Sequence, residues 1–96
     1  SVKELILEKG PKNDIQKTLV IGYYLEHFEN ITPFNADDIE KGFRLAKEAL
    51  PLNINDRVNS NINAGYIMEH SEKKNSRKAW LLTATGERFV ESGFKK

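Results

Sequence analysis

Two groups of polar residues in the second half of the chain have side chains suited to specific chemistry. Asparagines recur through residues 54–63, and an asparagine amide can form two hydrogen bonds with the edge of an adenine. Residues 73–78 then carry four cations in six positions. Lysine and arginine can neutralise phosphates and release their counterions. The first group is therefore suited to reading bases, and the second is suited to holding a nucleic-acid backbone.

Side chains that could catalyse a reaction or hold a metal form no recognisable pattern. His27 and His70 are the only histidines, and neither belongs to a His-Glu-x-x-His sequence or has a clear third ligand. Ser60 and Ser71 lack the motif that would place a base within hydrogen-bond reach. No glycine loop of the nucleotide-binding kind occurs. We therefore expect no enzyme activity, no cofactor and no metal site.

The composition is typical of one small globular domain. The chain has 96 residues, of which 39% are hydrophobic and 30% charged, and it has no cysteine. No apolar run approaches the roughly 18 residues that a membrane span needs, and no signal peptide is recognisable. We therefore expect a cytoplasmic protein without membrane contact. Because the chain starts at Ser1 and not at Met, we expect a domain excised from a longer protein or a tag remnant.

Charge is distributed unevenly along the chain, although the net charge is only +1. Residues 1–50 carry seven basic and nine acidic side chains, a net charge of −2. Residues 51–96 carry eight basic and five acidic side chains, a net charge of +3. A polyanionic partner is therefore expected to contact the C-terminal half.

Apolar residues at three- and four-residue steps predict the helices. The first long one has a broad apolar stripe through Ile15, Leu19, Tyr23 and Phe28, which predicts a central helix packed on two sides. Asn35 and Asn53 are suited to cap later helices, and Pro51 is expected to end the helix before it. The predicted helices cover residues 1–9, 14–29, 36–50, 54–64 and 83–94.

Between these helices the sequence favours short extended segments. Residues 31–34 include a proline and are expected to form a minimal edge strand. Residues 66–70 and 80–82 are extended and apolar, and the polar residues 72–78 between them predict a β-hairpin. Gly65 stands where a left-handed cap would end the preceding helix. We expect a single domain with a helix over 1–10, a core over 11–92 and a tail over 93–96.

This order of elements, with three local motifs, resembles the winged helix-turn-helix DNA-binding regulators of bacteria and archaea. Gly65-Tyr66-Ile67 is similar to the exit from the recognition helix into the first wing strand. Residues 77–86 are similar to the second wing strand and the Leu-Thr-x-x-Gly turn after it, and residues 34–39 to the start of the second helix. The resemblance covers residues 14–92. It implies an α+β, mostly α fold with a three-helix core, a two- or three-stranded wing, and extra N- and C-terminal helices.

The chain departs from the family pattern in two places. The second helix, expected over 36–50, is long for such a regulator. The third helix carries one basic residue, Arg57, and one acid, Asp56, where the family usually has basic and hydroxyl side chains.

The candidate nucleic-acid-binding residues lie on the outward face of the third helix and in the wing. A solvated helix face also tolerates asparagine, and a charged turn also aids solubility, so these interpretations stay open. The candidates are Asn55, Arg57, Asn59, Ser60 and Asn63 on the helix, and Lys73, Lys74, Arg77 and Lys78 in the wing.

The leading hypothesis is a double-stranded DNA-binding module, either a transcription regulator or part of a larger protein. The alternative is a winged-helix module for protein–protein interaction or dimerisation that binds no DNA. RNA binding is a third possibility. For the alternative, apolar side chains at both ends of the chain would pack against a partner or a second copy, namely Val2, Leu5 and Ile6 or Phe89, Val90 and Phe94.

Overall fold

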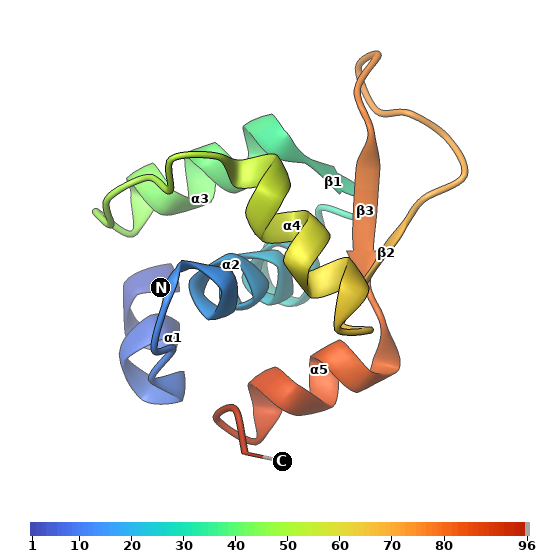
Figure 1. Cartoon of the computed structure of the whole chain (residues 1–96). Coiled ribbons are helices and arrows are strands. Elements are labelled where there is room, and N and C mark those ends of the chain that lie inside the picture. Colours follow the sequence, from blue (N-terminus) through green and yellow to red (C-terminus); the bar gives the residue numbers. More distant parts are fainter. Residues whose placement is uncertain (96) are drawn as a thin grey trace.

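Five helices, with a three-stranded antiparallel sheet at one side of them, make up the fold of residues 1–95, the part of the chain that the computed structural model describes (Figure 1). This confirms the expected α+β, mostly helical class. In chain order the elements are α1 (Val2–Lys9), α2 (Asp14–Phe28), β1 (Phe34–Asn35), α3 (Ala36–Leu45), α4 (Ile54–Asn63), β2 (Ile67–Glu69), β3 (Ala79–Leu82) and α5 (Ala84–Glu91).

Helix α2 is the centre of the core. Leu19, Val20 and Ile21 are consecutive and fully buried, so this part of the helix is covered on several sides. Contacts with α1, α3, α4 and α5 provide that cover, which confirms the prediction of a central helix. Phe28 was expected on the buried stripe, but it is the last residue of α2 and its side chain is 60% exposed.

Helix α1 is short and is held to the core by its apolar face. The side chain of Ser1 accepts from the backbone of Glu4, and the Glu4 side chain accepts from the Ser1 amine, so the two ends of a capping box are both present. Val2, Leu5 and Ile6 are buried in the main core cluster. The predicted helix over residues 1–9 is therefore confirmed, with Ser1 as its cap.

The sheet has the order β1-β3-β2, with β3 in the middle. Phe34 pairs with Trp80 across β1 and β3, and Ile67 pairs with Leu82 across β2 and β3. The edge strand was expected over residues 31–34 but begins at Phe34. The Ile31 N–H is bonded back to the Leu25 carbonyl at 2.9 Å, and a proline at position 33 has no N–H to give to a sheet.

Helix α3 ends earlier than the sequence predicts. A helix over residues 36–50 was expected, but α3 ends at Leu45. Lys47 takes the left-handed conformation with φ of 58°, and the Glu48 N–H bonds to the Phe43 carbonyl at 3.1 Å, the pattern that closes a helix end. The expected departure from the family, a long second helix, is therefore wrong.

The Glu48 side chain explains why the chain turns at this point. Its carboxylate accepts hydrogen bonds from Lys3 of α1 and from Lys17 of α2, the latter with an N–O distance of 2.9 Å. These bonds hold the pKa of Glu48 below its ordinary value. The connection after α3 is thus attached to both N-terminal helices.

The end of α4, the start of the wing and the start of α5 meet at Thr83. Its hydroxyl donates to the Gly65 carbonyl at 2.6 Å, and its N–H bonds to the Tyr66 carbonyl at 3.0 Å. Gly86 lies so near that a Cβ there would be 2.1 Å from the Tyr66 oxygen. The Leu-Thr-x-x-Gly turn therefore packs against Gly65 and Tyr66 and joins the segment after β3 to the segment before β2.

Helix α5 is shorter than the predicted helix over residues 83–94. It ends at Glu91 with Ser92 as its cap, and Gly93 and Phe94 follow in the left-handed conformation. The Phe94 N–H bonds to the Phe89 carbonyl at 2.9 Å, which turns the Phe94 ring back onto the Phe89 ring. The chain thus folds back at Gly93 and does not continue as helix.

Candidate nucleic-acid interface

Helix α4 presents a stripe of asparagines to solvent. Asn55, Asn59 and Asn63 are exposed and stand four residues apart, so they lie along one side of the helix. Val58 on the opposite side is fully buried, and α4 is anchored there against α2. Asn53 caps the helix by accepting from the Asp56 N–H at 3.1 Å, as expected. The stripe has the exposure that a contact surface needs.

The other two candidates on α4 are less available. The Ser60 hydroxyl donates to the Asp56 carbonyl at 3.1 Å, so its proton is already used within the helix. Ser60 and Arg57 are both half-buried. These two side chains are therefore less accessible to a partner than the three asparagines of the stripe.

One asparagine of α4 has a structural position that sequence analysis did not identify. Asn61 is 1% exposed, and its amide donates to the Ile15 carbonyl at 3.0 Å and to the Arg57 carbonyl at 2.9 Å. It thereby locks α4 onto the start of α2. Helical spacing could have indicated this position, because residue 61 comes seven positions after Ile54 and so lies on the apolar side of the helix.

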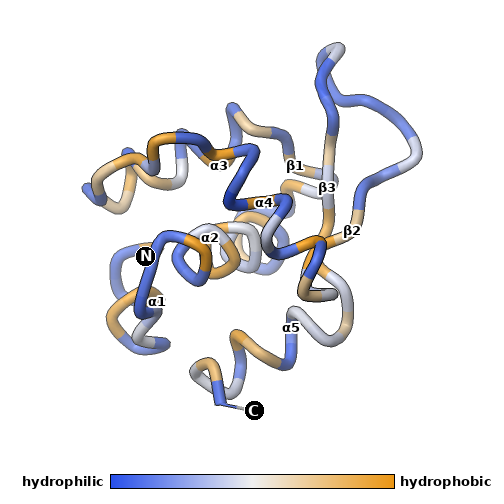
Figure 2. The backbone as a smooth tube through the Cα atoms, in the orientation of Figure 1, coloured by the Kyte–Doolittle hydropathy of each residue, from blue (hydrophilic) through white to orange (hydrophobic). Residues whose placement is uncertain are grey.

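The wing is a hairpin with a tight tip. Lys74 and Arg77 pair through two backbone hydrogen bonds of 2.8 and 3.1 Å. Asn75 and Ser76 between them have φ values of 52° and 65°, and positive φ at both positions is what a type I′ turn requires. Hydrophilic residues cover the tip and both arms, and the apolar part of the hairpin is confined to its base (Figure 2).

Two of the four wing cations are engaged inside the molecule. The Lys74 ammonium lies 2.8 Å from an Asp38 carboxylate oxygen and donates to the Pro33 carbonyl at 3.1 Å. The Arg77 guanidinium lies 3.3 Å from an Asp37 carboxylate oxygen. Both acids belong to the first turn of α3. Lys74 and Arg77 therefore hold the wing against the start of α3. The sequence did not indicate this role, because each cation lies 36 or more positions from the acid that it pairs with.

The other two wing cations face solvent. Lys73 and Lys78 are exposed, and neither forms an ion pair with any residue in the described part of the chain. They flank the turn on its two arms. Because their ammonium groups are not paired within the described residues, these are the wing cations that can bind an external phosphate.

The asparagine stripe and the wing meet at one place on the surface. Asn55, Arg77 and Lys78 line a shallow pocket of about 250 Å³, together with Trp80 and Ala36. The wing rises from the sheet next to α4, and the helix lies in front of α2 in the same view (Figure 1). The first turn of α4 therefore adjoins the base of the wing, as the DNA-binding hypothesis requires.

Acidic side chains lower the positive charge of this surface. Asp37 and Glu40 line a second shallow pocket between the starts of α3 and α4, and Asp56 is exposed on α4. Asp37 is balanced by Arg77, and Glu40 by Arg44 at 3.0 Å. Asp56 has no such partner among residues 1–95. A nucleic acid bound here would meet a mixed surface with its cations concentrated on the wing.

Comparison with known proteins identifies the fold. No protein-family model and no curated protein matches the chain. A solved structure does match, the MepR A103V mutant from a multidrug-resistant S. aureus clinical isolate, with a TM-score of 0.61 over 95% of this chain. The chain has a winged-helix fold.

The likeness to MepR is one of fold and not of sequence. The two chains are 19% identical, and this chain spans 61% of the length of the MepR chain. In the winged-helix arrangement α4 is the third core helix, and β2 and β3 are the strands of the wing.

Within residues 1–95, no helix has the length and apolar character needed to pass through a membrane.

Proposed function

We propose that the chain is a double-stranded DNA-binding module whose helix α4 enters the major groove while the wing holds the phosphate backbone. The observation that carries the proposal is the position of exposed Asn55 beside Arg77 and Lys78. MepR is a winged-helix transcription regulator, and the shared fold supports the same kind of role here, alone or within a longer protein.

The residues divide by task. Asn55, Asn59 and Asn63 are suited to base edges, where one bidentate pair with adenine contributes about 1–3 kcal/mol of discrimination. Lys73 and Lys78 bind phosphates, which positions the helix without reading sequence. Lys74 and Arg77 act mainly by holding the wing against α3, because their charges are already paired. Arg57 and Ser60 remain candidates at the flank of the groove.

Salt-dependent binding tests this division. The affinity of the Lys73→Ala/Lys78→Ala variant for a duplex is measured at several salt concentrations, and so is that of the unchanged chain. Because each phosphate contact contributes about 0.9 to the slope of log K against log salt, the slope should become shallower by about 2. Affinity at low salt should fall at least tenfold.

A variant with the same loss of charge elsewhere provides the control. Lys12 and Lys95 are exposed and lie on the connection after α1 and near the C-terminal end, away from the wing (Figure 1). Lys12→Ala/Lys95→Ala should keep the slope. Equal effects of the two double variants would show that net charge, and not the wing, governs binding. Tighter binding to a hairpin RNA than to the duplex would reassign the surface to RNA.

A specific observation also favours protein–protein interaction as a second candidate function. The apolar residues first considered for a partner are used within the chain: Val2, Leu5 and Ile6 are buried, and Phe89 stacks on Tyr66. Other large apolar side chains are exposed by 60% or more, namely those of Leu7, Phe28, Leu45 and Leu52. Self-association measured by sedimentation equilibrium, lost in Phe28→Ser and unaffected by duplex, would support this function.

A further inference from the structure

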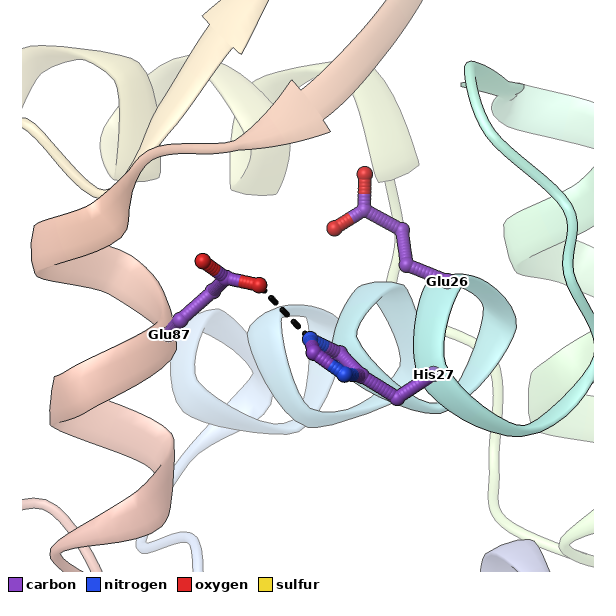
Figure 3. Close-up of side chains that lie close together, drawn as sticks. All are labelled: Glu26, His27 and Glu87. Carbon is purple, nitrogen blue, oxygen red and sulfur yellow. Dashed lines mark hydrogen bonds and ion pairs between the residues drawn. The ribbon is translucent and has the colours of Figure 1, made fainter.

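Three side chains with metal-binding atoms converge where the end of α2 meets the start of α5 (Figure 3). Glu26 and His27 are consecutive in α2, and Glu87 lies in the first turn of α5. One ligand atom from each side chain lies within 4.8 Å of the other two. The closest pair is His27 Nε2 and Glu87 Oε2, which are 2.6 Å apart.

The cluster carries more negative charge than its surroundings balance. Glu26 is half-buried, and no lysine or arginine among residues 1–95 pairs with it. Its carboxylate faces the carboxylate of Glu87, and like charges at this range repel. With a neutral imidazole the three groups sum to a charge of −2. A divalent cation between them would neutralise both carboxylates.

Neighbouring residues hold two of the three side chains in place. The Thr32 hydroxyl donates to Glu26 at 3.0 Å. The Tyr23 ring stacks on the His27 ring, with centroids 4.1 Å apart and planes 20° from parallel, and the Tyr23 hydroxyl is itself fixed by a 2.9 Å hydrogen bond to Glu91. Such outer contacts orient ligands in metal sites and are needed for their affinity.

The site is open enough for an ion and its remaining waters. The side chain of His27 is 37% exposed and that of Glu87 is 35% exposed. Zn²⁺ binds imidazole nitrogen and carboxylate oxygen at about 2.0–2.2 Å, which places tetrahedral ligand atoms about 3.3 Å apart. The His27–Glu87 contact must open slightly, and separations of up to 4.8 Å must close by as much as about 1.5 Å. The partly exposed His27 and Glu87 side chains can make that adjustment by rotation toward the half-buried Glu26.

We propose that Glu26, His27 and Glu87 form a site for a zinc-class transition-metal dication that links α2 to α5. The ligand set decides the class, because imidazole suits zinc and related metals, whereas calcium and magnesium prefer oxygen ligands alone. Three protein ligands leave further coordination positions for water. No pattern in the sequence indicated the site, because Glu87 comes 60 residues after His27.

An ion here would brace the base of the wing, since α5 follows β3 directly and Thr83 joins the two elements. The proposal does not depend on DNA binding, and its tests need no nucleic acid.

Zinc titration of the chain, freed of any affinity tag and of metal, tests the proposal. Calorimetry should show one Zn²⁺ bound per chain, and the midpoint of thermal unfolding should rise with zinc concentration, because a ligand that binds the folded state stabilises it. Calcium at the same concentrations should give neither effect. Zinc should also move the NMR signals of the His27 ring and leave those of His70 in place.

Matched histidine variants locate the ligand. His27→Gln and Glu87→Gln should each weaken zinc binding at least tenfold, whereas His70→Gln should leave it unchanged, because His70 lies in the wing with only backbone partners. Circular dichroism confirms that each variant folds. Absence of saturable binding, or binding that survives His27→Gln, would overturn the proposal. Equal binding of calcium would overturn the choice of metal class.

Discussion

Asparagine occupies both sides of α4, and its contribution differs between them. On the buried side, Asn61 is 1% exposed and its amide donates to two backbone carbonyls, those of Ile15 and Arg57. On the exposed side, Asn59 has no hydrogen bond within the described part of the chain and is available to a partner. The same type of side chain thus fixes the helix at Asn61 and is free to bind a partner at Asn59.

Asn61→Ala is expected to lower the free energy of unfolding by about 1–3 kcal/mol, since it removes the two hydrogen bonds of a buried side-chain amide, one of which joins α4 to α2. Urea denaturation followed by circular dichroism measures the change. Asn59→Ala on the exposed side should change it by no more than about 0.5 kcal/mol. Similar losses in both variants would contradict the assignment of Asn61 as a structural residue.

Individual side-chain roles could be predicted from the sequence only where a local pattern reports them. Asn35 and Asn53 were recognisable as caps because a capping residue lies beside the helix that it serves. The outward direction of Asn59 and Asn63 followed from helical spacing, which put Asn55 at the flank of the same face. The bond from Lys74 to Asp38 joins residues 36 positions apart, and nothing local to either one indicates it.

At the scale of elements, the wing is held in place by α3 as well as by the sheet. The first turn of α3 offers Asp37 and Asp38, which would place two uncompensated negative charges next to the candidate interface. Arg77 and Lys74 neutralise them and fix the wing in the same step. The arrangement explains why only Lys73 and Lys78 are left for phosphate.

The connection between α3 and α4 is fixed by ion pairs at Glu48, and this makes its contribution to stability depend on pH. The folded pKa of Glu48 is lowered, so its contribution is fully present above the unfolded value near 4.5 and is lost as pH falls through the folded pKa. At pH 7, Glu48→Gln should lower the unfolding free energy by about 0.5–1 kcal/mol.

Denaturant titrations of the two chains at pH 7 and at pH 3 check this dependence. The difference in stability between the Glu48→Gln variant and the unchanged chain should be smaller at the lower pH. Glu40→Gln, which removes only an exposed pair with Arg44 within α3, should have little effect at pH 7. A stability difference at Glu48 that stays constant or grows toward pH 3 would contradict the role of its charge.

Element ends were predictable where the residue type itself sets the backbone. Gly65 ends α4 in a left-handed conformation, and glycine adopts that conformation without steric cost. The end of α3 was missed because Lys47 takes the same conformation, although lysine is a good helix former. Contacts of Glu48 with α1 and α2 favour the turn, and such tertiary contacts override local preference.

The whole molecule separates its proposed activities in space. Asn55 at the start of α4 lies beside Arg77 and Lys78 of the wing, and the cluster of Glu26, His27 and Glu87 lies where α2 meets α5 (Figures 1 and 3). The order of elements, and with it the winged-helix fold, was predictable from periodicity and the wing-exit motif. The residues that come together from distant segments were not, because only the packed chain places α5 next to the end of α2.

NMR mapping of duplex binding tests the central claim most directly, which is that α4 and the wing form one DNA-contacting surface. A ¹⁵N-labelled chain is titrated with duplex DNA at low salt, and the shift of each backbone amide is followed. The largest changes should fall on Asn55, Asn59, Lys73 and Lys78, with little change in α1. Changes confined to α1 and the end of α3, or none at saturating duplex, would contradict the account.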